Sequence, residues 1–301
     1  MHTRIVTLPS AKIREVARVA LEGYWKQVVL FMFFYYLIDT GISNVLDIFF
    51  CTYQEIPLGD TGETLARNIH YGSSIYTAII SGPMSWALSK FMLDFFRYQK
   101  AEQSTVLEGF SCFARTFVLM MIIGAKIFLW SLLFVIPGIV ASFRYSQAFY
   151  VMVDNPEYSA LKCISESCRI MNGNKQKYLY LNLSFIGWNM LASLPALCFA
   201  TMLTEANGIS FVLLDLVFSI PILFVNAYMN MALTVFYELA TDNLTIVDQT
   251  QPEAASEVKS GWDASMYSAP APEETLAGFE PVKLPEAEAP VAEEETPEGE
   301  E

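Results

Sequence analysis

Residues 117–153 read FVLMMIIGAKIFLWSLLFVIPGIVASFRYSQAFYVMV, and this stretch decides the class of protein. It is almost entirely apolar, and its only charged side chains are Lys126 and Arg144. A water-soluble domain has little use for such a run, whereas a helix that crosses a bilayer needs about 20 apolar residues. Pro137 and Gly138 interrupt the run near its middle, where proline ends a helix and glycine permits a reversal. The stretch therefore predicts two membrane-spanning helices.

The composition of the whole chain is typical of an all-α, polytopic membrane protein. Of its 301 residues, 53% are hydrophobic and only 17% are charged. Apolar runs predict about six transmembrane helices within a membrane domain of residues 27–240, namely 28–50, 73–96, 117–136, 139–153, 178–201 and 209–237. The run 139–153 is short, so it crosses only with little tilt or with a helical extension beyond residue 153.

The distribution of Lys and Arg predicts the orientation of these helices. Basic residues are concentrated before the first run and after the second and fourth runs. The segment between the first two runs has only Arg67, and the segment between the last two has none. The positive-inside rule then places both termini in the cytoplasm, which requires a full reversal at Pro137 and Gly138. A single long helix kinked at Pro137 is the alternative, and it would place the basic segment after residue 153 outside.

Two further segments have the pattern of amphipathic helices. In residues 1–26, apolar side chains recur at helical spacing from Ile13 onward, after an N-cap at Ser10. In residues 156–172, a second apolar stripe precedes Gly173, a residue type that often follows the end of a helix. We expect both helices to lie at the lipid headgroups on the cytoplasmic side. Docking on a partner protein is the alternative, because an apolar stripe alone does not distinguish lipid from protein.

The acidic charge of the chain is confined to its C-terminal segment. Residues 246–301 hold 15 Asp and Glu and two Lys, so they carry −13 of the total charge of −14. This segment is rich in Glu, Pro and Ala and is predicted to be disordered. The remainder of the chain is nearly neutral and lacks the basic surface that nucleic-acid binding requires. The lipid bilayer is therefore the expected partner, with a protein bound through the tail or an amphipathic helix as the alternative.

Sequence motifs for catalysis or cofactor binding are absent. The chain has two His and five Cys, with no H-E-x-x-H, G-x-S-x-G, phosphate-binding loop or dinucleotide fingerprint. No pair of Cys has the C-x-x-C spacing, so neither a zinc site nor a disulfide framework is expected. We therefore predict no catalytic residue, no metal site and no cofactor.

Ionisable residues inside the predicted spans are the candidate functional residues, because each one needs a partner or a water-filled cavity. Counting about 1.5 Å of rise per residue places Asp39 at the depth of Lys126 and Arg144 at the depth of Asp215. Asp47 is a shallower alternative partner for Arg144. These depths predict two ion pairs, which either hold helices together or belong to a polar pathway.

Polar residues also occur in the last predicted span. Asn226 and Asn230 lie four residues apart, on one face of the helix, and are expected to form hydrogen bonds to a neighbouring helix. Pro221 precedes them in the same span and is expected to kink it.

Several motifs in the second half of the chain resemble a known family. They are LWSLLFVIPGI at 129–139, RYS at 144–146, DNP at 154–156, MNGNK at 171–175 and LSFIGW at 183–188. The chain from about residue 8 to 240 resembles the bacterial integral membrane family catalogued as domain of unknown function 975. It is more loosely similar to the membrane domain attached to some glycerophosphodiester phosphodiesterases. The resemblance implies a multi-pass protein of the bacterial inner membrane, and it brings no catalytic residues.

These observations support three hypotheses about function. The first is a non-enzymatic scaffold or lipid-associated helper, favoured by the amphipathic helices, the acidic tail and the lack of catalytic motifs. The second is a small transporter or permease component that uses the intramembrane charges. The third, a membrane enzyme that acts on lipid, has the least support.

Overall fold

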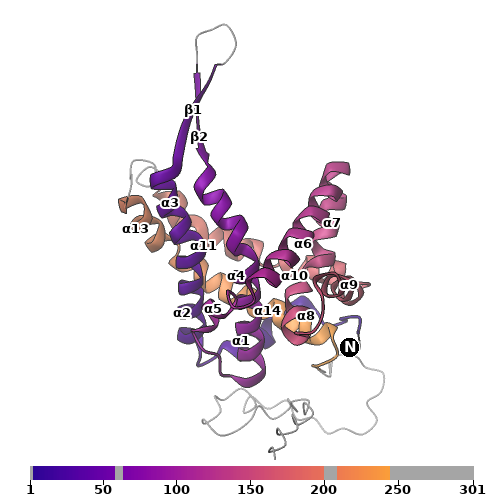
Figure 1. Ribbon diagram of the computed structural model, residues 1–301. Helices are drawn as coiled ribbons and strands as arrows, with labels where there is room; N and C mark the ends of the chain where they lie inside the picture. The colour runs from indigo at the N-terminus through magenta and orange to yellow at the C-terminus, as the bar shows by residue number, and fades with distance from the viewer. Residues whose placement is uncertain (1–2, 58–63, 200–208, 245–301) are drawn as a thin grey trace, which may run out of the picture. The chain divides into compact units, whose positions relative to one another are not determined.

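The apolar stretch from residue 117 forms two helices in the computed structural model, which describes residues 3–57, 64–199 and 209–244. Helices α6 (Phe113–Leu133) and α7 (Val135–Tyr145) pack against each other, and the chain reverses between them (Figure 1). The reversal occurs at Phe134, whose backbone is extended at φ −161° and ψ 154°. The predicted turn at Pro137 and Gly138 is therefore wrong by three residues. Pro137 lies in the first turn of α7, where its missing N–H interrupts no helical hydrogen bond.

The first half of the chain is helical except for one β hairpin. The order is α1 (Ser10–Leu21), α2 (Trp25–Tyr36), the π-helical turn η1 (Leu37–Gly41), α3 (Ile42–Phe50), β1 (Cys51–Pro57), β2 (Thr64–His70), α4 (Tyr71–Tyr98) and α5 (Thr105–Glu108). The two strands are antiparallel, with Cys51 opposite His70 and Pro57 opposite Thr64. The predominantly helical fold was expected, and the hairpin between α3 and α4 was not.

The regular elements in the described residues of the second half are all helices. After α6 and α7 come α8 (Ala148–Asp154), α9 (Ala160–Ile170), α10 (Lys175–Leu183), α11 (Ile186–Cys198), α13 (Ile209–Phe218) and α14 (Ile220–Ala240). Helix α14 is the central element: every residue from Met231 to Ala240 is buried, and the helix contacts α1, α2, α4 and α11. Pro221 lies at the start of α14, so the expected kink takes the form of a break at Ser219.

Four helical stretches are long and apolar enough to cross a membrane. They are Trp25–Phe50, Phe113–Leu133, Lys175–Cys198 and Ile220–Ala240. The predicted span 73–96 lies within α4, which is 28 residues long but has three charged residues near its end. The predicted span 139–153 is divided between α7 and α8, and 209–237 is divided between α13 and α14. Six crossings were predicted, and four are supported by length and composition.

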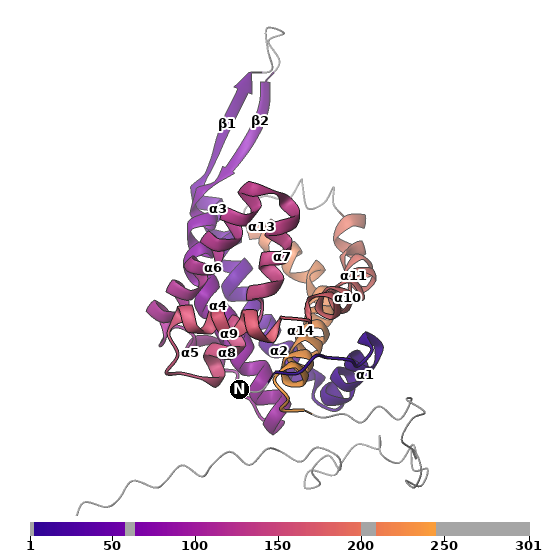
Figure 2. The ribbon, with the colours of Figure 1, turned by 90° about the vertical axis from the view of Figure 1, so that its right-hand side faces the viewer.

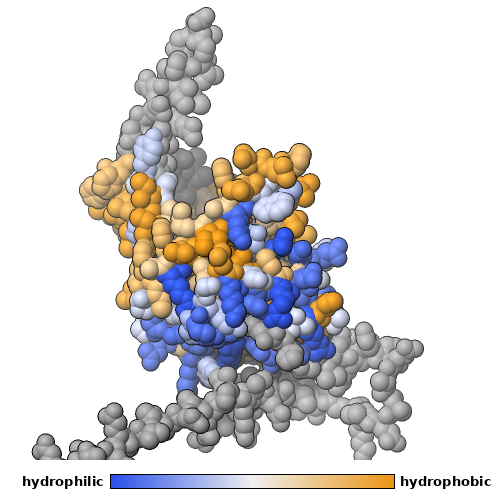
Figure 3. Space-filling view, turned by 45° about the vertical axis from the view of Figure 1, so that its right-hand side comes forward, coloured by the Kyte–Doolittle hydropathy of each residue, from blue (hydrophilic) through white to orange (hydrophobic). Residues whose placement is uncertain are grey.

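The surface of the helical body is divided by hydropathy. Figure 3 shows hydrophobic side chains over its upper part, where the α6–α7 pair ends, and mostly hydrophilic ones over its lower part. The end of this pair is strongly exposed: Leu132 has 77% of its surface accessible, Ile136 has 74% and Phe134 has 69%. Exposed apolar surface of this extent is what a bilayer covers in a membrane protein.

The two predicted amphipathic helices form, but their apolar faces are covered by the chain itself. In α1, the side chains of Ile13, Ala17 and Leu21 are completely buried, and the helix packs along α14 (Figure 2). In α9, Cys163 and Ile170 are completely buried against α6, α7 and α8. The apolar stripes therefore pack against the protein itself, and the position of the two helices at the lipid headgroups stays a prediction.

The ends of α9 follow its local sequence, whereas the N-cap of α1 is Pro9 and not the predicted Ser10, which is the first residue of the helix. Helix α9 begins at Ala160, four residues later than predicted, because the Ser159 side chain accepts a hydrogen bond from the Lys162 N–H and caps the helix. Gly173 follows the helix with a φ of +84°, the left-handed conformation that glycine adopts most easily. The predicted acidic tail at 246–301 lies outside the described residues.

Candidate functional site

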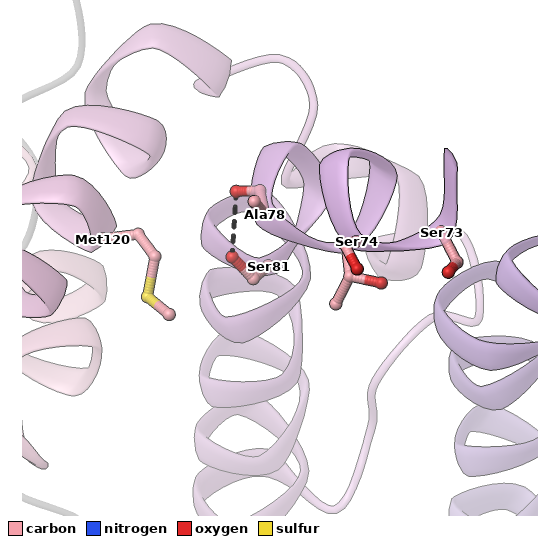
Figure 4. A pocket seen from close by; sticks show the side chains of 6 residues that line it. Ser73, Ser74, Ala78, Ser81 and Met120 are labelled. Carbon is pink, nitrogen blue, oxygen red and sulfur yellow. Dashed lines mark hydrogen bonds between the residues drawn. The ribbon is translucent and has the colours of Figure 1, made fainter. Parts of the chain in front are cut away.

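A hollow with several hydroxyl groups in its wall lies between α4 and α6. Its volume is about 460 Å³, and it is lined by Ser73, Ser74, Thr77, Ala78, Ser81 and Met120. Figure 4 shows the lining residues of α4 following one another along the helix, with Met120 of α6 across the gap. Hydroxyl groups therefore line one wall, and an apolar thioether lines the other.

Close contact between the two helices lies directly below this hollow. A Cβ placed on Gly82 of α4 would lie only 2.7 Å from the carbonyl oxygen of Thr116 in α6, so only glycine permits this approach. Gly109, between α5 and α6, similarly meets the backbone of Pro83. Beyond this crossing the helices diverge (Figure 1), which leaves the hollow between them.

Hydrogen bonds within α4 and to α3 occupy part of the hydroxyl capacity of this wall. Ser81 Oγ donates to the carbonyl of Ala78 at 3.2 Å, a bond to its own helix. Thr77 Oγ1 lies 3.5 Å from Ser43 Oγ of α3, at the limit of a hydrogen bond. A hydroxyl that donates to its own helix keeps an acceptor lone pair, so this wall can still bind a polar group of a ligand.

A second polar cluster joins α13 to the first membrane helix. The Asp215 carboxylate accepts hydrogen bonds from Tyr36 Oη at 2.5 Å and from Asn44 Nδ2 at 2.9 Å. Tyr36 Oη also lies 2.8 Å from Ser219 Oγ, at the break between α13 and α14. The cluster therefore connects two irregular points of the helical framework, the π-turn η1 and the break at Ser219. Wide helical turns of this type are frequent at functional sites.

Asp39 lies within η1 itself and is half-buried. Near it, Tyr76 Oη of α4 donates to the carbonyl of Ile38 at 2.6 Å, so α4 binds the backbone of the π-turn. Within the part of the chain that the structure describes, no salt bridge joins Asp39 to Lys126, and none joins Arg144 to Asp215. Both predicted ion pairs are therefore wrong.

The two cations of the α6–α7 pair have other surroundings. Lys126 Nζ lies 5.7 Å from the centre of the Tyr145 ring, within range of a cation–π interaction. The neighbouring Arg144 is half-buried, and its backbone carbonyl accepts a hydrogen bond from Ser167 Oγ at 2.8 Å. Of the carboxylates at matching depth, Asp215 is bound by tyrosine and asparagine donors.

The other residues predicted from the sequence are Asn226, Asn230 and Asp47. Asn230 Nδ2 donates to the carbonyl of Asn226 at 2.8 Å, so among the described residues this amide bonds within its own helix. Asp47 lies on α3, toward the end that leads into β1.

A buried charge network at the ends of three helices was not predicted. Arg97 of α4 donates from Nη1 to Asp154 Oδ1 at 2.7 Å and from Nη2 to Oδ2 at 3.1 Å, and from Nε to Glu238 Oε1 at 2.8 Å. Tyr237 Oη donates to Asp154 Oδ2 at 2.7 Å. Only 4% of the Glu238 side chain and 13% of that of Asp154 is exposed. The cation also lies where three helix C-termini concentrate negative charge.

The described residues offer little reactive chemistry. Burial raises the pKa of the Cys163 thiol above its usual range, although nearby Arg115 opposes this, so the reactive thiolate is disfavoured. Among the same residues, no group of three or more His, Cys, Asp or Glu side chains is arranged to hold a metal ion. The arrangement is suited to binding and to holding helices together.

Comparison with known proteins gives one match, to a family whose function is not known. No curated protein and no solved structure matches the chain. The matched region begins at the end of α6 and includes α7 to α14, with Arg144, Asp154, Asp215 and Glu238. Residues 132–243 match the family described as "Protein of unknown function (DUF975)", the family that the motifs from residue 129 onward resemble.

Proposed function

We propose that this chain is a non-enzymatic, lipid-associated protein of the bacterial inner membrane, which crosses the bilayer several times and has both termini in the cytoplasm. Four long apolar helices support the membrane location. The distribution of Lys and Arg supports the orientation. The family resemblance supports the bacterial setting, and the looser similarity to phosphodiesterase membrane domains is in line with a lipid-related role.

The hollow between α4 and α6 is the observation that carries this proposal. A bilayer lipid offers a polar headgroup or glycerol region together with acyl chains. Serine and threonine hydroxyls on α4 match the polar headgroup or glycerol region, and the apolar surface of α6 matches the acyl chains. Small-molecule sites are typically mostly apolar hollows of about 300–1,000 Å³ with a few polar groups, and this hollow lies in that range. The protein therefore holds one lipid between α4 and α6.

Native mass spectrometry of the full-length protein, released from lipid nanodiscs, tests this proposal. The wild type should retain a lipid after detergent washing. Filling the hollow with the double substitution Thr77→Leu and Ser81→Leu should remove it. Ser193→Leu is the matched control, because Ser193 is an exposed helical serine with a similar bond to its own helix, at Met190, outside the hollow. Equal retention by the filled variant and the wild type, or no retained lipid in either, would contradict the proposal.

A small transporter is the second candidate, and the Asp215 cluster is the observation in its favour. An intramembrane carboxylate bound by tyrosine and asparagine, beside two helix irregularities, has the features of ion pathways in membrane proteins. Asp215→Asn in proteoliposomes distinguishes the candidates. It should abolish ion or solute flux if the chain is a transporter, and it should leave lipid retention unchanged if the hollow binds lipid.

A further inference from the structure

The two cations of the α6–α7 pair lack a carboxylate partner within the described residues. Lys126 has the Tyr145 ring as its neighbour, and no salt bridge includes either Lys126 or Arg144. Both side chains are half-buried, so neither is sealed inside the protein and both can be reached from its surroundings. A cation within an apolar helix is costly in a bilayer unless an anion or water accompanies it.

The two cations lie at a similar level of the α6–α7 pair. α6 and α7 run in opposite directions from Phe134, and Tyr145 of α7 lies beside Lys126 of α6. Because Arg144 precedes Tyr145 in the chain, its Cα lies at almost the same level of the pair as the Lys126 ammonium group. Counted along the axes, Lys126 is about 12 Å from the turn at Phe134 and Arg144 is about 15 Å from it.

The surface between these cations and the turn at Phe134 determines what kind of anion can reach them. Residues from 128 to 136 form the exposed end of the pair, with Phe128 65% and Leu133 61% exposed. A bilayer covers such a surface, so an anion at this site must be carried by a molecule with apolar chains. A guanidinium and an ammonium are also the side chains that proteins use to bind phosphate, the former through two parallel hydrogen bonds.

We propose that Lys126 and Arg144 together bind the phosphate group of an anionic phospholipid that lies against the α6–α7 pair. The two carboxylates at matching depth, Asp39 and Asp215, are not bonded to these cations. An anion from outside the chain would therefore complement their charge, and a phospholipid phosphate is such an anion. The site lies on α6 and α7, whereas the hydroxyl wall of the hollow lies on α4. Binding here does not depend on the lipid proposed for the hollow.

The test compares lipid classes on the full-length protein in nanodiscs. With equal amounts of phosphatidylglycerol and phosphatidylcholine, the wild type should retain phosphatidylglycerol preferentially in native mass spectra. It should also have a higher Tm in nanodiscs that contain phosphatidylglycerol than in phosphatidylcholine alone. The double substitution Lys126→Gln and Arg144→Gln should reduce the preference about tenfold or more, because it removes two charge-assisted contacts.

Two further variants make the result specific. Lys175→Gln with Lys177→Gln removes the same amount of charge from α10 and should preserve the preference. Lys126→Arg with Arg144→Lys keeps both charges and should also preserve it, which separates loss of the site from loss of the fold. A wild type without preference for phosphatidylglycerol overturns the proposal, and so does an equal loss in the α10 control.

Inorganic phosphate and the filled hollow supply the remaining comparisons. Phosphate added to phosphatidylcholine nanodiscs should not raise the Tm of the wild type, and a rise equal to that given by phosphatidylglycerol would indicate a site for a soluble anion instead. The variant with Thr77→Leu and Ser81→Leu should keep its preference for phosphatidylglycerol. Loss of this preference in the filled variant would mean that the two lipid sites are one, against the present proposal.

Discussion

The guanidinium group of Arg97 binds the carboxylate of Asp154 through two parallel hydrogen bonds, and this pair joins the end of α4 to the end of α8. Glu238 of α14 binds the same guanidinium, so one cation holds three helices. The two carboxylates are almost inaccessible to solvent. Each would be an uncompensated buried charge if Arg97 were removed.

Arg97→Ala is therefore expected to destabilise the protein by about 3–5 kcal/mol, the usual effect of breaking a buried ion pair. Arg97→Lys should cost less, because lysine keeps the charge but cannot form the two parallel bonds. Thermal or denaturant unfolding in detergent measures both effects. Lys100→Ala, a short distance beyond α4, is the control and should change stability little. Similar stability of Arg97→Ala and wild type would show that the network does not hold the helices.

The glycines at the α4–α6 crossing give a second prediction. Gly82→Ala and Gly109→Ala should each reduce Tm, because the added Cβ meets the backbone of Thr116 or Pro83, which cannot move independently of its helix. Gly124→Ala is the matched control within α6, since no atom lies within 4 Å of the position of its Cβ. There the exchange should be neutral or slightly stabilising, because alanine has the higher helix propensity. Equal effects at all three positions would show that helix propensity dominates.

Double-mutant cycles distinguish the observed partner of Asp215 from the partners predicted by depth. Tyr36→Phe and Asp215→Ala remove the same hydrogen bond, so their effects on unfolding free energy should couple by about 0.5–3 kcal/mol. Asp39→Asn and Lys126→Gln do not share a bond, so their effects should add to within about 0.5 kcal/mol. Strong coupling in the second cycle would instead support an ion pair between Asp39 and Lys126.

Reporter fusions test the orientation of the helices. Fusions at Ala66 and Gly208 should report from outside the membrane, and fusions at Gln103, Asn174 and Asp248 should report from the cytoplasm. The prediction follows from the distribution of Lys and Arg and from the reversal between α6 and α7. An external signal at Asn174 would show that the chain crosses only once between Arg115 and Lys162.

The apolar pattern of the sequence identified the helices, but it did not identify where each helix breaks. The turn at Phe134 illustrates the reason. Every residue from 127 to 136 except Ser131 is apolar, so hydropathy changes little across the turn. Proline and glycine directed the prediction to positions 137 and 138, although proline is also well accommodated in the first turn of a helix.

Amphipathic pattern and depth are both incomplete descriptions of packing. The stripe of α1 showed that one face must be covered, but its cover, α14, lies some 200 residues later in the chain. Depth placed Asp39 level with Lys126, yet it gives no direction around the helix axis. An ion pair needs both a matching depth and side chains that face each other. Asp215 instead accepts hydrogen bonds from Tyr36 and Asn44 of the neighbouring helical stretch.

The Arg97 network was missed because its residues lie at or near the ends of helices. At that position, Arg97 contributed only to the prediction of helix orientation, as one of the basic residues after the second apolar run. Glu238 offered a signal, since it is an acidic residue at the end of a long apolar stretch and would need a cation nearby.

The π-turn η1 also sets the angular phase of α3 relative to α2. A regular helix advances about 100° per residue, so the eight steps from Tyr36 to Asn44 would leave these side chains about 80° apart. A wide turn absorbs roughly one extra residue, which brings the two directions to within about 20° of each other. Both side chains can then reach the single carboxylate of Asp215. If the same residues formed a regular α-helix instead, Asn44 would be rotated away from that carboxylate.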